Sequence, residues 1–168
     1  MVNFKRWLKH VFMPPWAWRR AFPQATLDAI ETAIRTSEIQ HGGEIRFAIE
    51  NSLAPALAWR GISGRERAIE VFSSLRVWDT EQNSGVLIYL LLADRDIEIL
   101  ADRGIAVKVE PDAWEAVAQS MEAAFRQGEF EQGALAGIRQ ISTLLAAHFP
   151  PGGHNPDELS NRPVIMRR

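Results

Sequence analysis

The strongest pattern in the chain is an unbroken run of eight apolar residues, Val86–Ala93. A run of this length is too short to cross a bilayer and is typical of a strand buried on both faces. A second apolar segment, Ile97–Ala101, follows after a three-residue polar turn, which predicts an antiparallel hairpin. Because a hairpin folds back on itself, we expect Asp102 to return close to Asp79 and Asn83.

Two further segments have the spacing of strands. Polar and apolar residues alternate over Glu44–Glu50, which predicts a strand with its apolar side chains on one face. Residues Ile105–Val109 are predicted as a short third strand or as an extension of the second hairpin strand. Between these segments, Asn51–Ser63 is expected to be a loop, with room for one helical turn in its LAPALAW stretch.

Four segments carry apolar residues at helical spacing. We expect helices over about Thr26–Gln40, Ser63–Val77, Asp112–Gln127 and Glu131–His148. Thr26 and Asp112 are the expected N-terminal caps. Gly133 and Gly137 lower helix propensity in the last helix and are expected to allow close approach of a neighbouring element. The side chains expected to face the core are Ile69, Phe72 and Leu75 in the second helix and Trp114, Val117, Ala118, Met121 and Phe125 in the third.

The order of these elements predicts an α/β fold, a three-layer α/β/α sandwich with a small mixed central sheet. The first two strands are joined through a helix and should be parallel, with a right-handed crossover. The chain divides into a basic aromatic N-terminal arm (1–24), the α/β/α domain (25–149) and a Pro/Gly-rich C-terminal tail (150–168). We expect this tail to be extended or mobile.

The composition excludes several classes of function. The chain has no cysteine, which removes disulfides, thiolate catalysis and cysteine-based metal sites. A net charge of −2 argues against binding of nucleic acid. The glycine patterns of nucleotide-binding loops and the G-x-S-x-G pattern of hydrolases do not occur, and the four histidines lack the spacing of metal ligands.

The charge is distributed unevenly along the chain. Residues 1–20 contain five basic and no acidic side chains, whereas the rest of the chain carries 14 basic against 21 acidic residues. The same segment contains Trp7, Phe12, Trp16 and Trp18. Basic and aromatic side chains together suit the surface of an anionic membrane. The alternative is that the aromatic rings cover an edge of the core while the basic groups face water.

The hairpin also resembles a known family. Trp78 and Asp79 precede a short polar stretch ending in N-x-G-V-L, a fully apolar strand and then D-R-x-x-x-I. Two further stretches belong to the same pattern. They are an opening strand, HGGEIRFAIE, and a closing segment with spaced glycines, AFRQGEFEQGALAGI. In order and spacing these motifs resemble the TPM domain family over about residues 26–148.

The resemblance implies an α/β/α sandwich, divalent-cation binding as in some members, and weak acid phosphatase activity as in at least one. Members include a thylakoid-lumen phosphatase of photosystem II repair and a modulator of nicotinic receptors, and many bacterial members are membrane-anchored. One departure is clear. Many members carry G-x-G-L-E after the second hairpin strand, but this chain has DRGIA at 102–106, so the glutamate is absent.

Four acids and one amide are the candidate cation ligands, because the predicted topology brings them toward one end of the sheet. Oxygen-only ligands suit Ca²⁺ or Mg²⁺. Unpaired carboxylates at close range repel, so a cation or Arg103 should neutralise them. Three of the acids also have a structural alternative, since Asp79 can cap a turn, Asp112 can cap its helix, and Asp102 can pair with Arg103 or Arg76. The candidate metal ligands are Asp79, Asn83, Asp102, Glu44 and Asp112.

Two functions follow as hypotheses. The first is a protein- or membrane-interaction module with a divalent-cation site, binding an unknown protein partner or contacting an anionic membrane through residues 1–20. The alternative is a weak metal-assisted acid phosphatase, in which the cation polarises a phosphoryl oxygen. The N-terminal segment lacks the long apolar stretch of a signal peptide, so we expect a cytoplasmic protein, peripheral at the inner membrane face in the first case.

Overall fold

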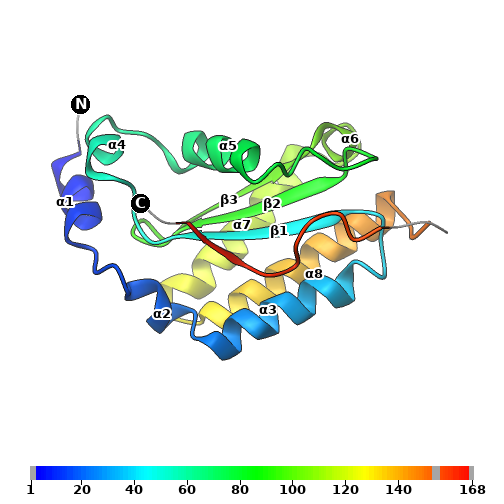
Figure 1. The fold of residues 1–168 in the computed structure, drawn as a ribbon, viewed down its shortest axis with the longest axis horizontal. Helices are drawn as coiled ribbons and strands as arrows, with labels where there is room; N and C mark the ends of the chain where they lie inside the picture. Colours follow the sequence, from blue (N-terminus) through cyan, green and yellow to red (C-terminus); the bar gives the residue numbers. More distant parts are fainter. Residues whose placement is uncertain (1–2, 153–155, 167–168) are drawn as a thin grey trace.

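The computed structural model describes residues 3–152 and 156–166. Within these residues the centre of the molecule is a four-stranded sheet with the order β3-β2-β1-β4 (Figure 1). β1 (Glu44–Glu50) pairs in parallel with β2 (Gly85–Leu91) and with β4 (Val164–Met166). β3 (Asp96–Ala101) pairs antiparallel with β2. The predicted hairpin and the predicted parallel pair are therefore confirmed.

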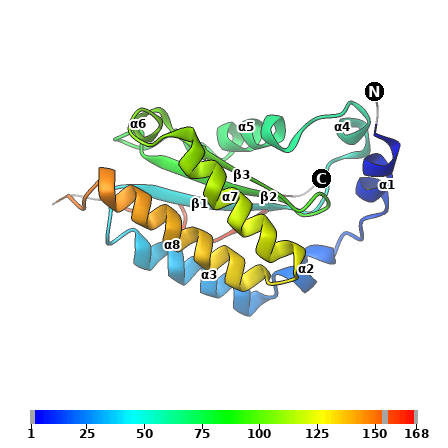
Figure 2. The ribbon, with the colours of Figure 1, turned by 180° about the vertical axis from the view of Figure 1, so that it is seen from behind.

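Helices cover both faces of this sheet, which confirms the three-layer sandwich (Figures 1 and 2). One face packs against α3 (Gln24–Ser37), α7 (Pro111–Arg126) and α8 (Phe130–His148). The other face packs against α4 (Pro55–Trp59) and α5 (Gly64–Ser74). The helical turn of α4 lies inside the segment expected to be a loop with room for one.

The two cores follow the alternation of the strands. Ile45, Phe47 and Ile49 of β1 join the core beneath α3, α7 and α8, and Ala48 joins the smaller core beneath α5. β2 is buried along its whole length, because it lies between β1 and β3 and is covered on both faces. This accounts for the long apolar run in the sequence.

α7 and α8 pack closely because α8 presents glycines at the contact. A Cβ atom at Gly133 would lie 2.8 Å from the Cβ of Ala124, and one at Gly137 would collide with the thioether sulfur of Met121. The expected close approach is confirmed. All five apolar residues predicted for the inner side of α7 are buried.

The two predicted helix caps are wrong. α3 begins directly after Pro23, and Thr26 lies inside the helix, where its buried hydroxyl donates to Glu131 Oε2 at 2.6 Å. α7 begins at Pro111, so Asp112 lies in its first turn rather than capping it. Proline preceding or opening a helix presets the backbone angle that the first turn needs.

Two details of the expected secondary structure are also wrong. Residues Arg103–Ala106 form the short helix α6, not a strand. The amide of Asp102 donates to the carbonyl of Gly85, the first residue of β2, so no further β2 residue is available for pairing. Ile69 of α5 is 53% exposed and does not face the core, whereas Phe72 and Leu75 are partly buried against the smaller core as predicted. The fully buried residues of α5 are Gly64, Ala68 and Val71, whose small size lets the helix lie close to the sheet.

Both ends of the chain fold onto the domain (Figure 1). The arm forms α1 (Phe4–Phe12), which contacts α4, and α2 (Ala17–Ala21). The tail runs along the outer edge of β1 and adds β4, a strand that the sequence pattern did not predict. None of the helices in the described ranges has the length and apolar character needed to span a membrane.

Candidate metal centre

The candidate centre lies at the end of the sheet where β1 and β2 begin. Glu44 pairs with Gly85 in register, and Asp102 bonds to the same Gly85 from the other side. Directly paired residues point their side chains to the same face, so these three positions form one row. A Cβ at Gly85 would collide with the carbonyl oxygen of Val77. The Val77 backbone therefore occupies the space between Glu44 and Asp102.

Glu44 instead gathers with two acids from other segments. Glu38, Glu44 and Asp157 each offer one carboxylate oxygen, and these oxygens all lie within 4.8 Å of one another. In the part of the chain that the structure describes, this is the one group of three or more acidic or histidine side chains so arranged. We call these three residues the acid cluster.

The backbone holds each glutamate of the acid cluster in place. Glu38 directly follows α3 as its C-cap, and its Oε1 accepts a hydrogen bond from the amide of Ile45 at 2.8 Å. Glu44 opens β1, and its Oε2 accepts from the amide of Leu159 at 3.1 Å. Arg46 fixes the passing tail, because its Nη1 donates to the carbonyls of Ser160 at 2.5 Å and Arg162 at 2.7 Å.

Burial strongly raises the pKa values of the two glutamates in the acid cluster. Glu38 is 8% exposed and Glu44 is 2% exposed, whereas Asp157 is exposed to solvent. Desolvation raises the pKa of Glu38 to about 8 and that of Glu44 to about 7. Hydrogen bonds from backbone amides oppose this rise, and repulsion from the neighbouring acids adds to it. The acid cluster thus favours either bound protons or a bound cation at neutral pH.

Two members of the acid cluster have no basic partner in the described residues. Neither Glu44 nor Asp157 forms an ion pair with a lysine or arginine of that part of the chain. Arg35 lines the same hollow, which has a volume of about 270 Å³. Its guanidinium, however, bonds to Glu31 on its own helix at 2.7 Å.

Asn161 supplies a further oxygen at the hollow. Its side chain is 7% exposed, and its Nδ2 donates to Asp157 Oδ2 at 3.3 Å. Its Oδ1 is buried and has no hydrogen-bond partner among the described residues. Leaving a buried carbonyl oxygen unpaired costs about 1–3 kcal/mol. The three carboxylates and this carbonyl belong to side chains that line one hollow, and oxygen ligands of these kinds suit Ca²⁺ or Mg²⁺ rather than a soft metal.

The sequence model of the TPM domain family matches residues 19–144. The chain belongs to the TPM domain family. The solution structure of BA42, from the psychrophilic bacterium Bizionia argentinensis, is 33% identical to this TPM domain protein and has a TM-score of 0.75. The match covers 84% of this chain and 93% of that one.

A second solved structure is more distant. The N-terminal domain of a protein from P. gingivalis is 17% identical over 78% of this chain and 82% of that one, with a TM-score of 0.57, and shows the fold alone. No curated protein matches the chain. Glu38 and Glu44 lie inside the family match, but Asp157 and Asn161 lie beyond it.

In this TPM domain the structure does not bring the predicted acidic ligands together, because the one group of three acids in the described residues contains only Glu44 of them. Glu44 joins the acid cluster. Asp79 pairs with Arg76 at 2.6 Å on the surface. Asp112 lines a different hollow, beside Arg65 and Glu98. The proposed metal role of the other four residues stays a prediction.

Asn83 and Asp102 do lie near each other, as the hairpin required. Asp102 caps α6 by accepting from the amide of Arg103 at 2.7 Å, and the carbonyl of Asn83 accepts from the amide of Gly104 at 3.1 Å. Asp102 Oδ2 is buried without a hydrogen-bond partner in the described residues. At this end of the sheet, one oxygen of the Asp102 carboxylate therefore accepts no hydrogen bond from the described residues.

Sequence reasoning missed Glu38, Asp157 and Asn161. Glu38 lies six residues before Glu44, on the far side of a glycine turn, and Asp157 and Asn161 lie in the tail. The available signal was a short polar stretch, DELSN at 157–161, in a segment otherwise rich in proline and glycine. Its placement depends on β4, which was not predicted.

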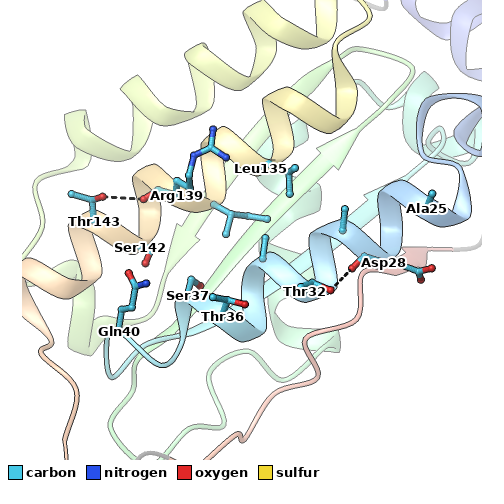
Figure 3. A pocket seen from close by; sticks show the side chains of 13 residues that line it. Ala25, Asp28, Thr32, Thr36, Ser37, Gln40, Leu135, Arg139, Ser142 and Thr143 are labelled. Carbon is cyan, nitrogen blue, oxygen red and sulfur yellow. Dashed lines mark hydrogen bonds between the residues drawn. The ribbon is translucent and has the colours of Figure 1, made fainter.

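Another hollow lies between α3 and α8 (Figure 3). It has a volume of about 850 Å³ and is lined mainly by small residues. The hydroxyls of Thr32 and Thr143 donate to carbonyls of their own helices, those of Asp28 and Arg139. These two hydroxyls therefore already have hydrogen-bond partners.

Proposed function

We propose that this TPM domain binds a divalent cation, with Ca²⁺ preferred, through Glu38, Glu44, Asp157 and Asn161. The observation that carries the proposal is the buried Asn161 Oδ1, which has no hydrogen-bond partner among the described residues and belongs to a side chain lining the hollow that the three carboxylates share. A cation would satisfy this oxygen and neutralise the acids together.

The donor set favours Ca²⁺ over Mg²⁺. Ca²⁺ takes six to eight oxygens in flexible geometry and accepts carboxylates in one- or two-oxygen contact. Mg²⁺ keeps several waters and usually binds one or two carboxylates in strict octahedral geometry. Three carboxylates and a side-chain carbonyl supply enough oxygens for most of a calcium shell, and the exposed side of Asp157 leaves access for water.

Such a cation would fasten the tail to the domain. Glu38 and Glu44 belong to the family-matched region, whereas Asp157 and Asn161 arrive with the segment that leads into β4. A cation bound to all four would strengthen the placement of that segment. The domain would then be an interaction module whose C-terminal strand responds to calcium.

The test is a titration of the whole chain with CaCl₂ and MgCl₂, followed by NMR and calorimetry. We expect saturable Ca²⁺ binding with shifts at residues 38, 44, 157 and 161, and weaker Mg²⁺ binding. Asp157→Asn removes one charge at an exposed position and should lower Ca²⁺ affinity at least tenfold. Asp79→Asn, an equal change at the Arg76 pair, is the matched control and should bind like the unaltered protein.

Asn161 allows a second comparison. Asn161→Leu removes the oxygen at similar volume and should weaken binding, whereas Asn161→Asp adds a charge and should strengthen it. Absence of saturable binding at millimolar Ca²⁺ would overturn the proposal. So would Ca²⁺-induced shifts confined to Asp79, Asn83 and Asp102.

The phosphatase alternative stays a prediction. A metal-assisted hydrolase needs cationic groups beside the metal to hold the phosphate, and the arginine at this hollow is engaged by Glu31. We therefore expect no Ca²⁺- or Mg²⁺-dependent turnover of p-nitrophenyl phosphate. Turnover that disappears in Asp157→Asn would instead support the hydrolase.

A further inference from the structure

Helix α1 turns Arg6 and His10 toward the protein and leaves Phe4, Phe12 and two lysines exposed to solvent. Arg6 Nε bonds to Asp94 Oδ2 at 2.8 Å, in the turn between β2 and β3. His10 is fully buried, with Nε2 3.2 Å from the same oxygen, and its Nδ1 accepts from the amide of Leu53 at 3.1 Å. These bonds fix which side of α1 faces the domain.

The outward side of α1 carries an apolar stripe. Phe4, Leu8 and Phe12 follow at intervals of four, which places them along one side of the helix. Phe4 is 57% exposed and Phe12 is 75% exposed. Lys5 and Lys9, both exposed, lie along the flank of this stripe.

Aromatic rings extend this surface onto α4. Trp7 stacks on Phe4 with ring centroids 5.7 Å apart and meets Trp59 edge-on at 5.5 Å. Trp59 is 51% exposed, and Trp16, in the turn after α1, is 60% exposed. Half of the eight large exposed apolar side chains in the described residues thus belong to α1, α4 or the turn after α1. We call Phe4, Phe12, Trp16 and Trp59 the aromatic surface.

Basic side chains predominate around the aromatic surface. Residues 1–20 contain no acidic side chain, and exposed Arg60 follows Trp59. The nearby acid Asp94 is already bonded to Arg6 and His10. Exposed tryptophan and phenylalanine beside lysine match the headgroup region of an anionic bilayer, where each basic residue contributes about 1 kcal/mol.

We propose that the α1–α4 end of the molecule seats on an anionic lipid bilayer, with the aromatic surface entering the headgroup layer. This end lies opposite the α3–β1 turn that carries Glu38 and Glu44 (Figure 1). Binding there is independent of the proposed cation site. The bilayer is favoured over a protein groove because apolar and basic side chains share one outward side of α1 and no acid interrupts them.

The test is co-sedimentation of the whole chain, in EDTA, with vesicles of phosphatidylcholine alone or with phosphatidylcholine mixed with phosphatidylglycerol. We expect binding to the anionic vesicles, weakened by salt, and little binding to the neutral ones. Phe4→Ser with Phe12→Ser should reduce binding at least tenfold, and Lys5→Glu with Lys9→Glu should do the same. The matched control is Ile69→Ser with Val107→Ser, which removes exposed apolar side chains elsewhere and should leave binding unchanged.

Circular dichroism melting would check that each variant is folded. The proposal is overturned if the unaltered chain does not sediment with anionic vesicles, or if the double phenylalanine variant binds as well as the control. A concentration-dependent dimer that the phenylalanine changes abolish, without vesicle binding, would overturn it too and would assign the surface to a second copy of the chain instead.

Discussion

Replacing Glu38 with glutamine should make the protein more stable at alkaline pH and less responsive to calcium. In the folded state burial raises the pKa of Glu38 to about 8, from the ordinary value of 4.5 that applies to the unfolded chain. The favourable contribution of this raised pKa to the free energy of unfolding is complete below pH 4.5 and is lost as the pH rises toward 8. Glutamine keeps the carbonyl oxygen that accepts from Ile45 and carries no charge at any pH.

The magnitude follows from the size of the shift. One pKa unit corresponds to about 1.4 kcal/mol, so Glu38 alone accounts for up to about 5 kcal/mol between pH 4.5 and 8. Glu44 titrates over an overlapping range and repels Glu38, so part of this energy belongs to the pair. We expect the free energy of unfolding of Glu38→Gln to exceed that of the unaltered protein by about 3 kcal/mol at about pH 8.5 without cation. For a chain of this size that gain raises Tm by about 6–12 °C.

The assay is thermal unfolding at about pH 5 and about pH 8.5, below and above the raised pKa, in EDTA and in millimolar CaCl₂. At the acidic pH the two proteins should melt close together, and at the alkaline pH in EDTA the variant should melt higher. Calcium should raise the Tm of the unaltered protein at alkaline pH and close most of this gap, because a bound ion stabilises the folded state alone. Equal Tm values for both proteins in EDTA at both pH values would refute the reasoning about buried charge.

Two further predictions concern packing and charge. Gly85→Ala places a methyl group against the Val77 carbonyl and should lower the free energy of unfolding, measured by urea titration, by about 2–4 kcal/mol. The control Gly42→Ala, with no atom nearer than 3.7 Å to the added carbon, should leave the free energy of unfolding nearly unchanged. Equal losses in the two variants would contradict this account. Arg67 donates hydrogen bonds of 2.9 and 3.1 Å to the buried carboxylate of Glu50. Arg67→Met removes this partner and should lower the free energy of unfolding by about 3–5 kcal/mol. Adding Glu50→Gln should recover part of that loss, and failure to recover any would show that the charge is not its cause.

The sequence predicted those parts of the fold that depend on local pattern. The apolar run of β2, the alternation of β1 and the inner side of α7 each have a periodicity that burial imposes, so their bounds were found within a few residues. The order of helices and strands then predicted the layers, and the family resemblance implied the same fold. The helix starts were missed because prolines 23 and 111 set them by backbone geometry, which outweighed the preference of threonine and aspartate for capping.

Less of the candidate site than of the fold could be predicted from the sequence. Glu44 was identified because it opens a predicted strand, but its neighbours depend on where the tail lies. Three residues, Val164–Met166, pair with β1 through backbone hydrogen bonds, and so short a strand leaves little apolar pattern. The predicted convergence of Glu44 with Asp102 also presumed open space between them. The Val77 backbone lies close against Gly85 and fills that space, and only the folded structure reveals this contact.

The strand β4 has a consequence for the solubility of shortened forms of this protein. It covers the outer edge of β1 at Ala48, Ile49 and Glu50. A chain cut before Pro156 would leave these amide and carbonyl groups open beside the apolar residues of β1. Uncovered strand edges of this kind recruit strands from other molecules. Loss of this C-terminal segment should therefore promote aggregation well before it unfolds the domain.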